Sequence, residues 1–117
     1  LCGINEGETE VDLSEEDLEA PDAVLLSFDL EFNRALKTAN LGRNAIGDEG
    51  TAALSEALKS NNTLETLKLY FNQIGVAGAQ SLADMLQVNR ALTSLGLTEN
   101  EIGAGGARAI ADSLPQS

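Results

Sequence analysis

Apolar residues and glycines recur along the chain with a spacing of 28 residues. A fixed period of about 20 to 50 residues is the signature of a repeat protein. A weaker copy precedes three regular ones and carries Glu8, Glu16 and Glu19 where the others have Leu, Asn and Gly. The registers kept in all three regular copies are Leu41, Leu69 and Leu97; Asn44, Asn72 and Asn100; Ile46, Ile74 and Ile102; and Gly50, Gly78 and Gly106.

Each repeat predicts a short strand, a turn and a helix. In residues 64–69, Leu67 and Leu69 alternate with polar residues, which is typical of a strand with one buried face. Glycines follow and permit the chain to tighten before a helix over residues 79–86, whose apolar positions recur at helical spacing. Equivalent helices are predicted over residues 50–58 and 106–114, and Pro115 ends the last one.

The repeated asparagine register predicts a structural role. Asn44, Asn72 and Asn100 follow the strands, where the chain must turn. A side-chain amide can both donate and accept, so a column of asparagines can satisfy backbone groups of neighbouring turns. We therefore predict a buried asparagine ladder along the stack.

The repeat pattern L-x-x-L-x-L-x-x-N, followed by N-x-I-G-x-x-G-A-x-x-L, resembles the leucine-rich repeat family. It is most similar to the ribonuclease-inhibitor-like class and to repeats of NOD-like receptors and of Ran GTPase-activating protein. The resemblance implies an α/β solenoid of four 28-residue repeats, with parallel strands on the concave face and helices on the convex face. It predicts one domain over residues 1–117: an acidic degenerate first repeat or cap in 1–35, then repeats over 36–63, 64–91 and 92–117.

Charge narrows the function classes. The chain has 117 residues and a net charge of -12, and its first 31 residues hold eleven acids and no base. Such a surface repels phosphate groups, so nucleic acid and membrane are not expected as partners, and a basic protein partner is favoured. An acidic end that only keeps a terminus solvated is the alternative.

Residue content argues against catalysis. The chain has no histidine, so neither a histidine-dependent triad nor a Cys/His zinc site can be built from it alone. The single Cys2 allows no disulfide within the chain, which favours a cytoplasmic location. The glycines at 103–106 lack the spacing of a phosphate loop, and the acids at 12–17 fail as a calcium loop, so we expect no cofactor and no metal.

The outward strand positions are the candidate binding site. Stacked repeats align them in columns that are free of the leucine framework and vary in chemistry. Tyr70 and Phe71 stand out, because aromatic residues and arginine often anchor interfaces. We predict partner contacts at Asn40, Arg43, Thr66, Lys68, Tyr70, Phe71, Thr98 and Glu99, with Glu10, Asp12, Ser14 and Glu15 extending the columns into the first repeat.

Three functions stay open. The chain is expected to be a non-catalytic protein-binding scaffold whose partner lies on the concave face. The resemblance also implies a regulator of a small GTPase, with Arg43 as the only arginine in these columns, or a structural segment of a larger NOD-like sensor. The last repeat keeps Leu95 and Leu97 with no polar cap, so the isolated chain is expected to form a homodimer through that end or to be a fragment of a longer protein.

Overall fold

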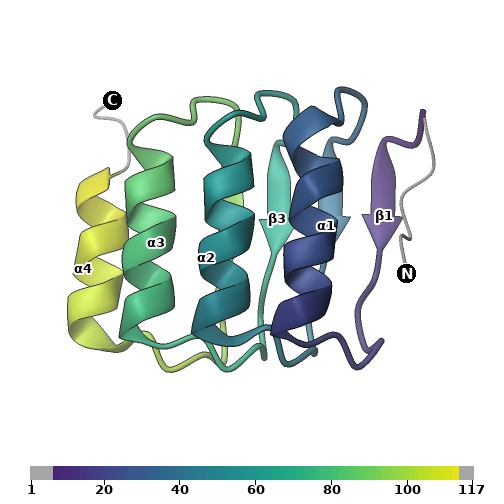
Figure 1. Ribbon diagram of the computed structural model, residues 1–117. Coiled ribbons are helices and arrows are strands. Elements are labelled where there is room, and N and C mark those ends of the chain that lie inside the picture. Colours follow the sequence, from purple (N-terminus) through teal and green to yellow (C-terminus); the bar gives the residue numbers. More distant parts are fainter. Residues whose placement is uncertain (1–6, 114–117) are drawn as a thin grey trace.

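The computed structural model describes residues 7–113, with side chains up to Ala111. Cys2, Leu114 and Pro115, on which the predictions about the thiol and the end of the last helix depend, lie outside these residues. Strands and helices alternate along the chain (Figure 1) as β1 (Glu10–Asp12), α1 (Ala20–Phe32), β2 (Thr38–Asn40), α2 (Gly47–Leu58), β3 (Thr66–Lys68), α3 (Val76–Leu86), β4 (Ser94–Gly96) and α4 (Gly103–Ser113).

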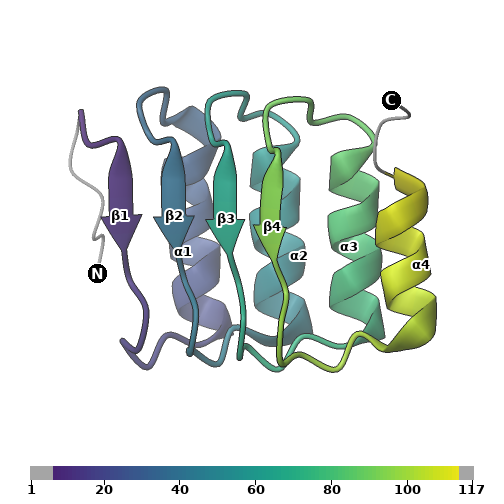
Figure 2. The same ribbon diagram turned by 180° about the vertical axis from the view of Figure 1, so that it is seen from behind.

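The four strands form one parallel sheet in the order β1-β2-β3-β4. Glu10 pairs with Thr38, Thr38 with Thr66 and Thr66 with Ser94, so each strand is shifted by one repeat from its neighbour. The helices line up on one side of the sheet and leave the other side open (Figure 2). We call this open surface the strand face. The arrangement confirms the predicted α/β solenoid.

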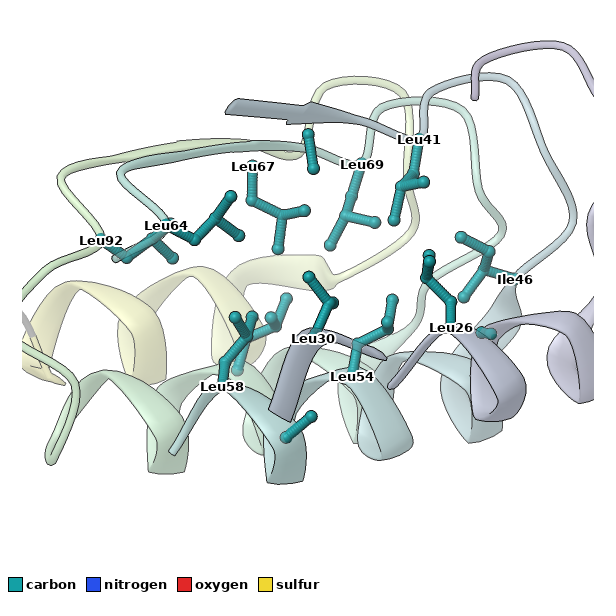
Figure 3. Close-up of a cluster of buried hydrophobic side chains, with 14 of the residues drawn as sticks. Leu26, Leu30, Leu41, Ile46, Leu54, Leu58, Leu64, Leu67, Leu69 and Leu92 are labelled. Carbon is teal, nitrogen blue, oxygen red and sulfur yellow. The ribbon is translucent and has the colours of Figure 1, made fainter. Parts of the chain in front are cut away.

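The core lies between the sheet and the helices (Figure 3). Leu67 and Leu69 point toward the helices and are fully buried, as are Leu54 of α2 and Leu82 of α3. The predicted alternation is therefore confirmed. Strand β3 covers only Thr66–Lys68 and is shorter than the expected 64–69.

The helices begin three residues earlier than predicted, so α2 starts at Gly47 and α3 at Val76. Gly47 has a left-handed φ of 68° at the start of α2, whereas Gly50 lies inside the helix and has another role than a turn. A Cβ on Gly50 would lie 2.6 Å from Cγ2 of Ile46 and 3.0 Å from Cβ of Ala23 in α1. Glycine at this position lets each helix approach the preceding one closely. Within the described residues, no helix is long and apolar enough to cross a membrane.

Asparagine side chains join neighbouring repeats after the strands. Asn72 is fully buried; its Oδ1 accepts a hydrogen bond from the Ile46 amide at 3.2 Å, and its Nδ2 donates to the Leu41 carbonyl at 2.8 Å. Asn44 and Asn100 bond in the same way to the repeats before them. These bonds satisfy backbone groups that the turns leave unpaired.

A second set of asparagines does the same before the strands. Nδ2 of Asn61 donates to the Leu30 carbonyl at 2.8 Å, and Nδ2 of Asn89 donates to the Leu58 carbonyl at 2.7 Å. Asn33 occupies the equivalent position in the first repeat, where its Oδ1 accepts from backbone amides of the following turn. Each repeat is thus tied to its neighbour at both ends of its strand.

Asp48 of α2 caps the helix of the next repeat. Its Oδ1 accepts hydrogen bonds from the amides of Gly75 at 2.7 Å and Gly78 at 2.9 Å, at the start of α3. Asp48→Ala is expected to lower the free energy of unfolding by about 1 kcal/mol, because these amides lose their acceptor. Urea denaturation measures the loss. Asp48→Asn keeps an oxygen there and should lose less; equal losses in the two variants would contradict a capping role.

Candidate functional site

The predicted contact residues on the strands lie in the expected columns, which run across the strand face from one repeat to the next. Thr66 stands between Thr38 and Ser94 at the starts of the strands, and Lys68 stands beside Asn40 at their ends. All except Ser94 are half-buried, and Ser94 is exposed. These side chains flank the leucine framework rather than form part of it.

The residues three positions after the strands form another column, and their backbone conformation is left-handed. Glu15, Arg43, Phe71 and Glu99 have positive φ angles of 57°, 59°, 57° and 62°. Residues other than glycine adopt this left-handed conformation at a cost of about 1–2 kcal/mol each. Since every repeat has it, the turn after the strand requires this conformation, yet none of the four positions is occupied by glycine.

Arg43 lies between side chains of the repeats on either side. Its guanidinium carbon is 4.3 Å from the centroid of the Phe71 ring, and its Nε is 3.8 Å from Oε2 of Glu15. The Arg43 amide also donates to the Tyr70 carbonyl at 2.8 Å. A cation over an aromatic face is attracted by the ring quadrupole, so Arg43 and Phe71 orient each other.

Tyr70 depends on glycines in the adjacent repeats. A Cβ on Gly42 would overlap the Tyr70 ring, coming within 2.6 Å of its Cδ2. A Cβ on Gly96 would lie 3.5 Å from Cδ1 of the same ring. The ring therefore occupies space on the strand face that a side chain at position 42 would fill. Tyr70 is half-buried there.

At the end of the strand face, Arg43 thus stacks on Phe71 and its amide bonds to the Tyr70 carbonyl. We call Arg43, Tyr70 and Phe71 the aromatic–arginine cluster. Phe71 remains 40% exposed, so its ring is accessible beside the Arg43 guanidinium. Lys68, the last residue of β3, lies two positions before Tyr70 and faces the same side of the sheet.

The other predicted residues are less closely associated with the cluster. Thr66 lies at the far end of β3. Thr98 and Glu99 belong to the next repeat and are exposed, and the Thr98 carbonyl accepts from the Phe71 amide at 3.1 Å. Oδ1 of Asn40 accepts from the amide of Gly42 at 3.0 Å, so this side chain supports its own turn.

Acidic groups cover the strand face at β1. Asp12 is exposed, and hydrogen bonds from the hydroxyl and then the amide of Ser14 hold its pKa below the usual value, with a smaller contribution from the charge of Lys68. The strand face is therefore acidic over the first repeat and basic at Lys68. Among the residues that the structure describes, no cluster of acidic, cysteine or histidine side chains could hold a metal ion.

Sequence reasoning missed two supports of the cluster. It gave no indication that the Tyr70 ring needs the space above Gly42. It also treated Glu15 as an extension of a column, whereas Glu15 pairs with Arg43. The signal available for Gly42 was a glycine standing in the register of Tyr70 and Thr98.

Comparisons with known proteins agree with this architecture. A solved structure described as "Leiomodin-1 Actin-Binding Site 2 (ABS2)" superimposes with a TM-score of 0.83 at 28% sequence identity, covering 90% of this chain and 62% of that one. The present chain thus spans less than two thirds of that neighbour. A comparison with curated proteins finds no match.

A sequence model of the family described as "Leucine Rich repeat" matches three segments, at residues 32–55, 60–83 and 88–111. The segments are evenly spaced by one repeat and together cover more than half of the chain. Each segment includes one strand and most of the helix that follows it. The chain belongs to the leucine-rich repeat family.

Proposed function

We propose that the chain is a non-catalytic scaffold that binds a protein partner on its strand face. The observation that carries this proposal is the aromatic–arginine cluster of Arg43, Tyr70 and Phe71. Tyrosine and arginine are enriched among the residues that dominate binding energy, and here they are already oriented by contacts within the chain. Pre-organised side chains lose little freedom when a partner binds.

The left-handed turn after the strand recurs in every repeat, so it belongs to the solenoid and does not by itself indicate a binding site. At this turn Arg43 and Phe71 carry side chains that stack on each other, which glycine could not do. The convex helices and the 28-residue period support assignment to the ribonuclease-inhibitor-like class.

The partner is best sought among proteins with a basic surface. The first 31 residues carry eleven acids and no base, and Glu10 and Asp12 bring part of this charge onto the strand face. On a separate ground, the likeness to a structure described as an actin-binding site, monomeric actin is the first protein to test. The single cysteine of the sequence favours a cytoplasmic location for this encounter.

Regulation of a small GTPase finds less support in the geometry. An arginine finger must extend into the partner's active site. The Arg43 side chain instead stacks on Phe71 and pairs with Glu15.

The test compares actin binding by the wild type and a double variant. Tyr70→Ala with Phe71→Ala is expected to weaken the complex by at least about tenfold, because the variant removes both aromatic anchors from an accessible surface. Isothermal titration calorimetry with monomeric actin measures the affinity. Circular dichroism verifies that the double variant keeps its fold.

Gln73→Ala serves as the matched control, since Gln73 is an exposed residue of the same turn. It should leave the affinity unchanged. Wild-type binding that survives the loss of both aromatic rings would contradict the strand-face proposal, and absence of wild-type binding would remove actin as the partner.

Self-association through the last repeat is a second candidate activity. Leu95 and Leu97 are only partly buried, whereas Leu67 and Leu69 in the preceding repeat are fully buried. They line an open pocket of about 260 Å³ together with Ile110 and neighbouring residues. In the described part of the chain nothing covers this apolar edge beyond β4.

We expect sedimentation velocity to reveal concentration-dependent dimers of the wild-type chain, because a second copy would cover the open pocket. Leu97→Lys should shift the equilibrium to monomer by placing a charge at that edge. A wild type that stays monomeric across the concentration series would contradict a homodimer.

A further inference from the structure

The outer side of α1 is apolar, although it faces away from the core. Leu25, Phe28 and Phe32 are 53%, 60% and 73% exposed, and Val24 beside them is also exposed. By helical spacing they lie on the side of α1 opposite the buried Leu26 and Leu30. We call Val24, Leu25, Phe28 and Phe32 the α1 patch. A helix that is apolar on both sides is unusual for a surface position.

The repeat framework does not require these residues. One repeat later, the position of Phe28 holds Glu56, and one repeat after that it holds Asp84. The position of Leu25 holds the smaller Ala53 and Ser81. Among the registers of the four patch residues, only that of Phe32 carries an exposed large apolar residue in a later repeat, at Val88. The α1 patch is thus a property of the first helix alone, and contiguous exposed apolar residues indicate an interaction site.

The side of α1 that corresponds to the packed side of α2 carries different residues. Gly50 lets α2 approach α1, but the equivalent residue of α1 is Asp22, whose Oδ2 accepts from the Glu19 amide at 2.9 Å. Asp29 occupies the position of the buried Ala57. A further helix packed as α1 packs on α2 would meet these two carboxylates, so this surface suits a partner of different geometry.

The acidic residues around the α1 patch favour a partner with basic residues. Asp22, Asp29 and Glu31 lie on α1 within the acid-rich first 31 residues, which have no basic residue. Arg34, the nearest base along the chain, donates to carbonyl oxygens at the end of α1. A second copy of this chain would bring like charges together, and an anionic membrane would be repelled.

We propose that the α1 patch binds a basic amphipathic helix of a partner protein. The apolar side of that helix covers Leu25, Phe28 and Phe32, and its Lys or Arg residues face the acids that border the patch. This is helix-on-helix recognition with charge complementarity at the rim. The α1 patch lies on the opposite side of the sheet from the aromatic–arginine cluster. Binding at the α1 patch is therefore independent of binding on the strand face.

The test uses a synthetic helical peptide of leucine and lysine with its leucines on one side, and a scrambled peptide of the same composition. Titration calorimetry with the whole chain should detect binding of the amphipathic peptide, weakening as salt is raised. Phe28→Ser with Phe32→Ser should weaken it by about tenfold. Val88→Ser removes an apolar side chain that is 59% exposed and lies outside the α1 patch, so this variant should bind the peptide like the wild type. Tyr70→Ala with Phe71→Ala should also leave it unchanged.

Four results would overturn the proposal. The scrambled peptide could bind equally well, which would indicate charge attraction without recognition. The phenylalanine variant could bind like the wild type. Sedimentation could reveal a wild-type dimer that this variant dissociates, which would identify a second copy as the occupant. Binding of the wild type, but not the variant, to vesicles of neutral phosphatidylcholine would identify a membrane surface.

Discussion

Replacing Leu69 with alanine is expected to lower the free energy of unfolding by about 2–5 kcal/mol. Leu69 is fully buried between the sheet and the helices, and its neighbours Leu41 and Leu67 are equally enclosed, so the surroundings cannot collapse freely into the gap. Equilibrium urea denaturation measures the loss. Because repeats contact mainly their neighbours, a defect in a central repeat affects both sides of the stack.

Leu25→Ala is the matched control for this variant, since it deletes the same atoms from a side chain that is largely exposed. Its effect should stay within about 0.5 kcal/mol. Similar losses at the two leucines would contradict the assignment of Leu69 to the core.

Replacing Asn72 with alanine is expected to cost about 1–3 kcal/mol, because it leaves a buried backbone group without a partner. The Ile46 amide donates to Oδ1 of Asn72 at 3.2 Å, and the structure gives it no second acceptor among the described residues. The Leu41 carbonyl loses one donor but keeps Nδ2 of Asn44 at 2.9 Å. The orphaned Ile46 amide therefore accounts for most of the loss.

Asn62→Ala provides the comparison in the same urea titration, because Asn62 is exposed. This variant should be nearly neutral. A loss below about 0.3 kcal/mol for Asn72→Ala would show that the asparagine contributes little to the stack.

The register of the solenoid could be predicted from sequence because the same residue types recur at one spacing. The pairing of Thr38 with Thr66 and Ser94 follows from this period alone. The helix starts could not be predicted in the same way. Gly50 and Gly78 look like turn residues in a sequence, and only the approach of the preceding helix reveals why a side chain is excluded there.

The candidate site was predictable in composition but not in geometry. Outward strand positions and aromatic type identified Tyr70 and Phe71, whereas the stacking of Arg43 on Phe71 depends on left-handed turns at residues that are not glycine. No propensity points to that conformation for arginine or phenylalanine. The exposure of Phe28 was visible in principle, since later repeats carry Glu56 and Asp84 in its register.

Chemical-shift mapping determines whether a protein partner binds on the strand face. Isotopically labelled chain is titrated with unlabelled monomeric actin, and backbone amide signals are followed. The largest changes are expected at Arg43, Tyr70 and Phe71 and at the adjoining Lys68, with the convex helices little affected. Changes confined to α2 and α3, with these amides unmoved, would contradict it.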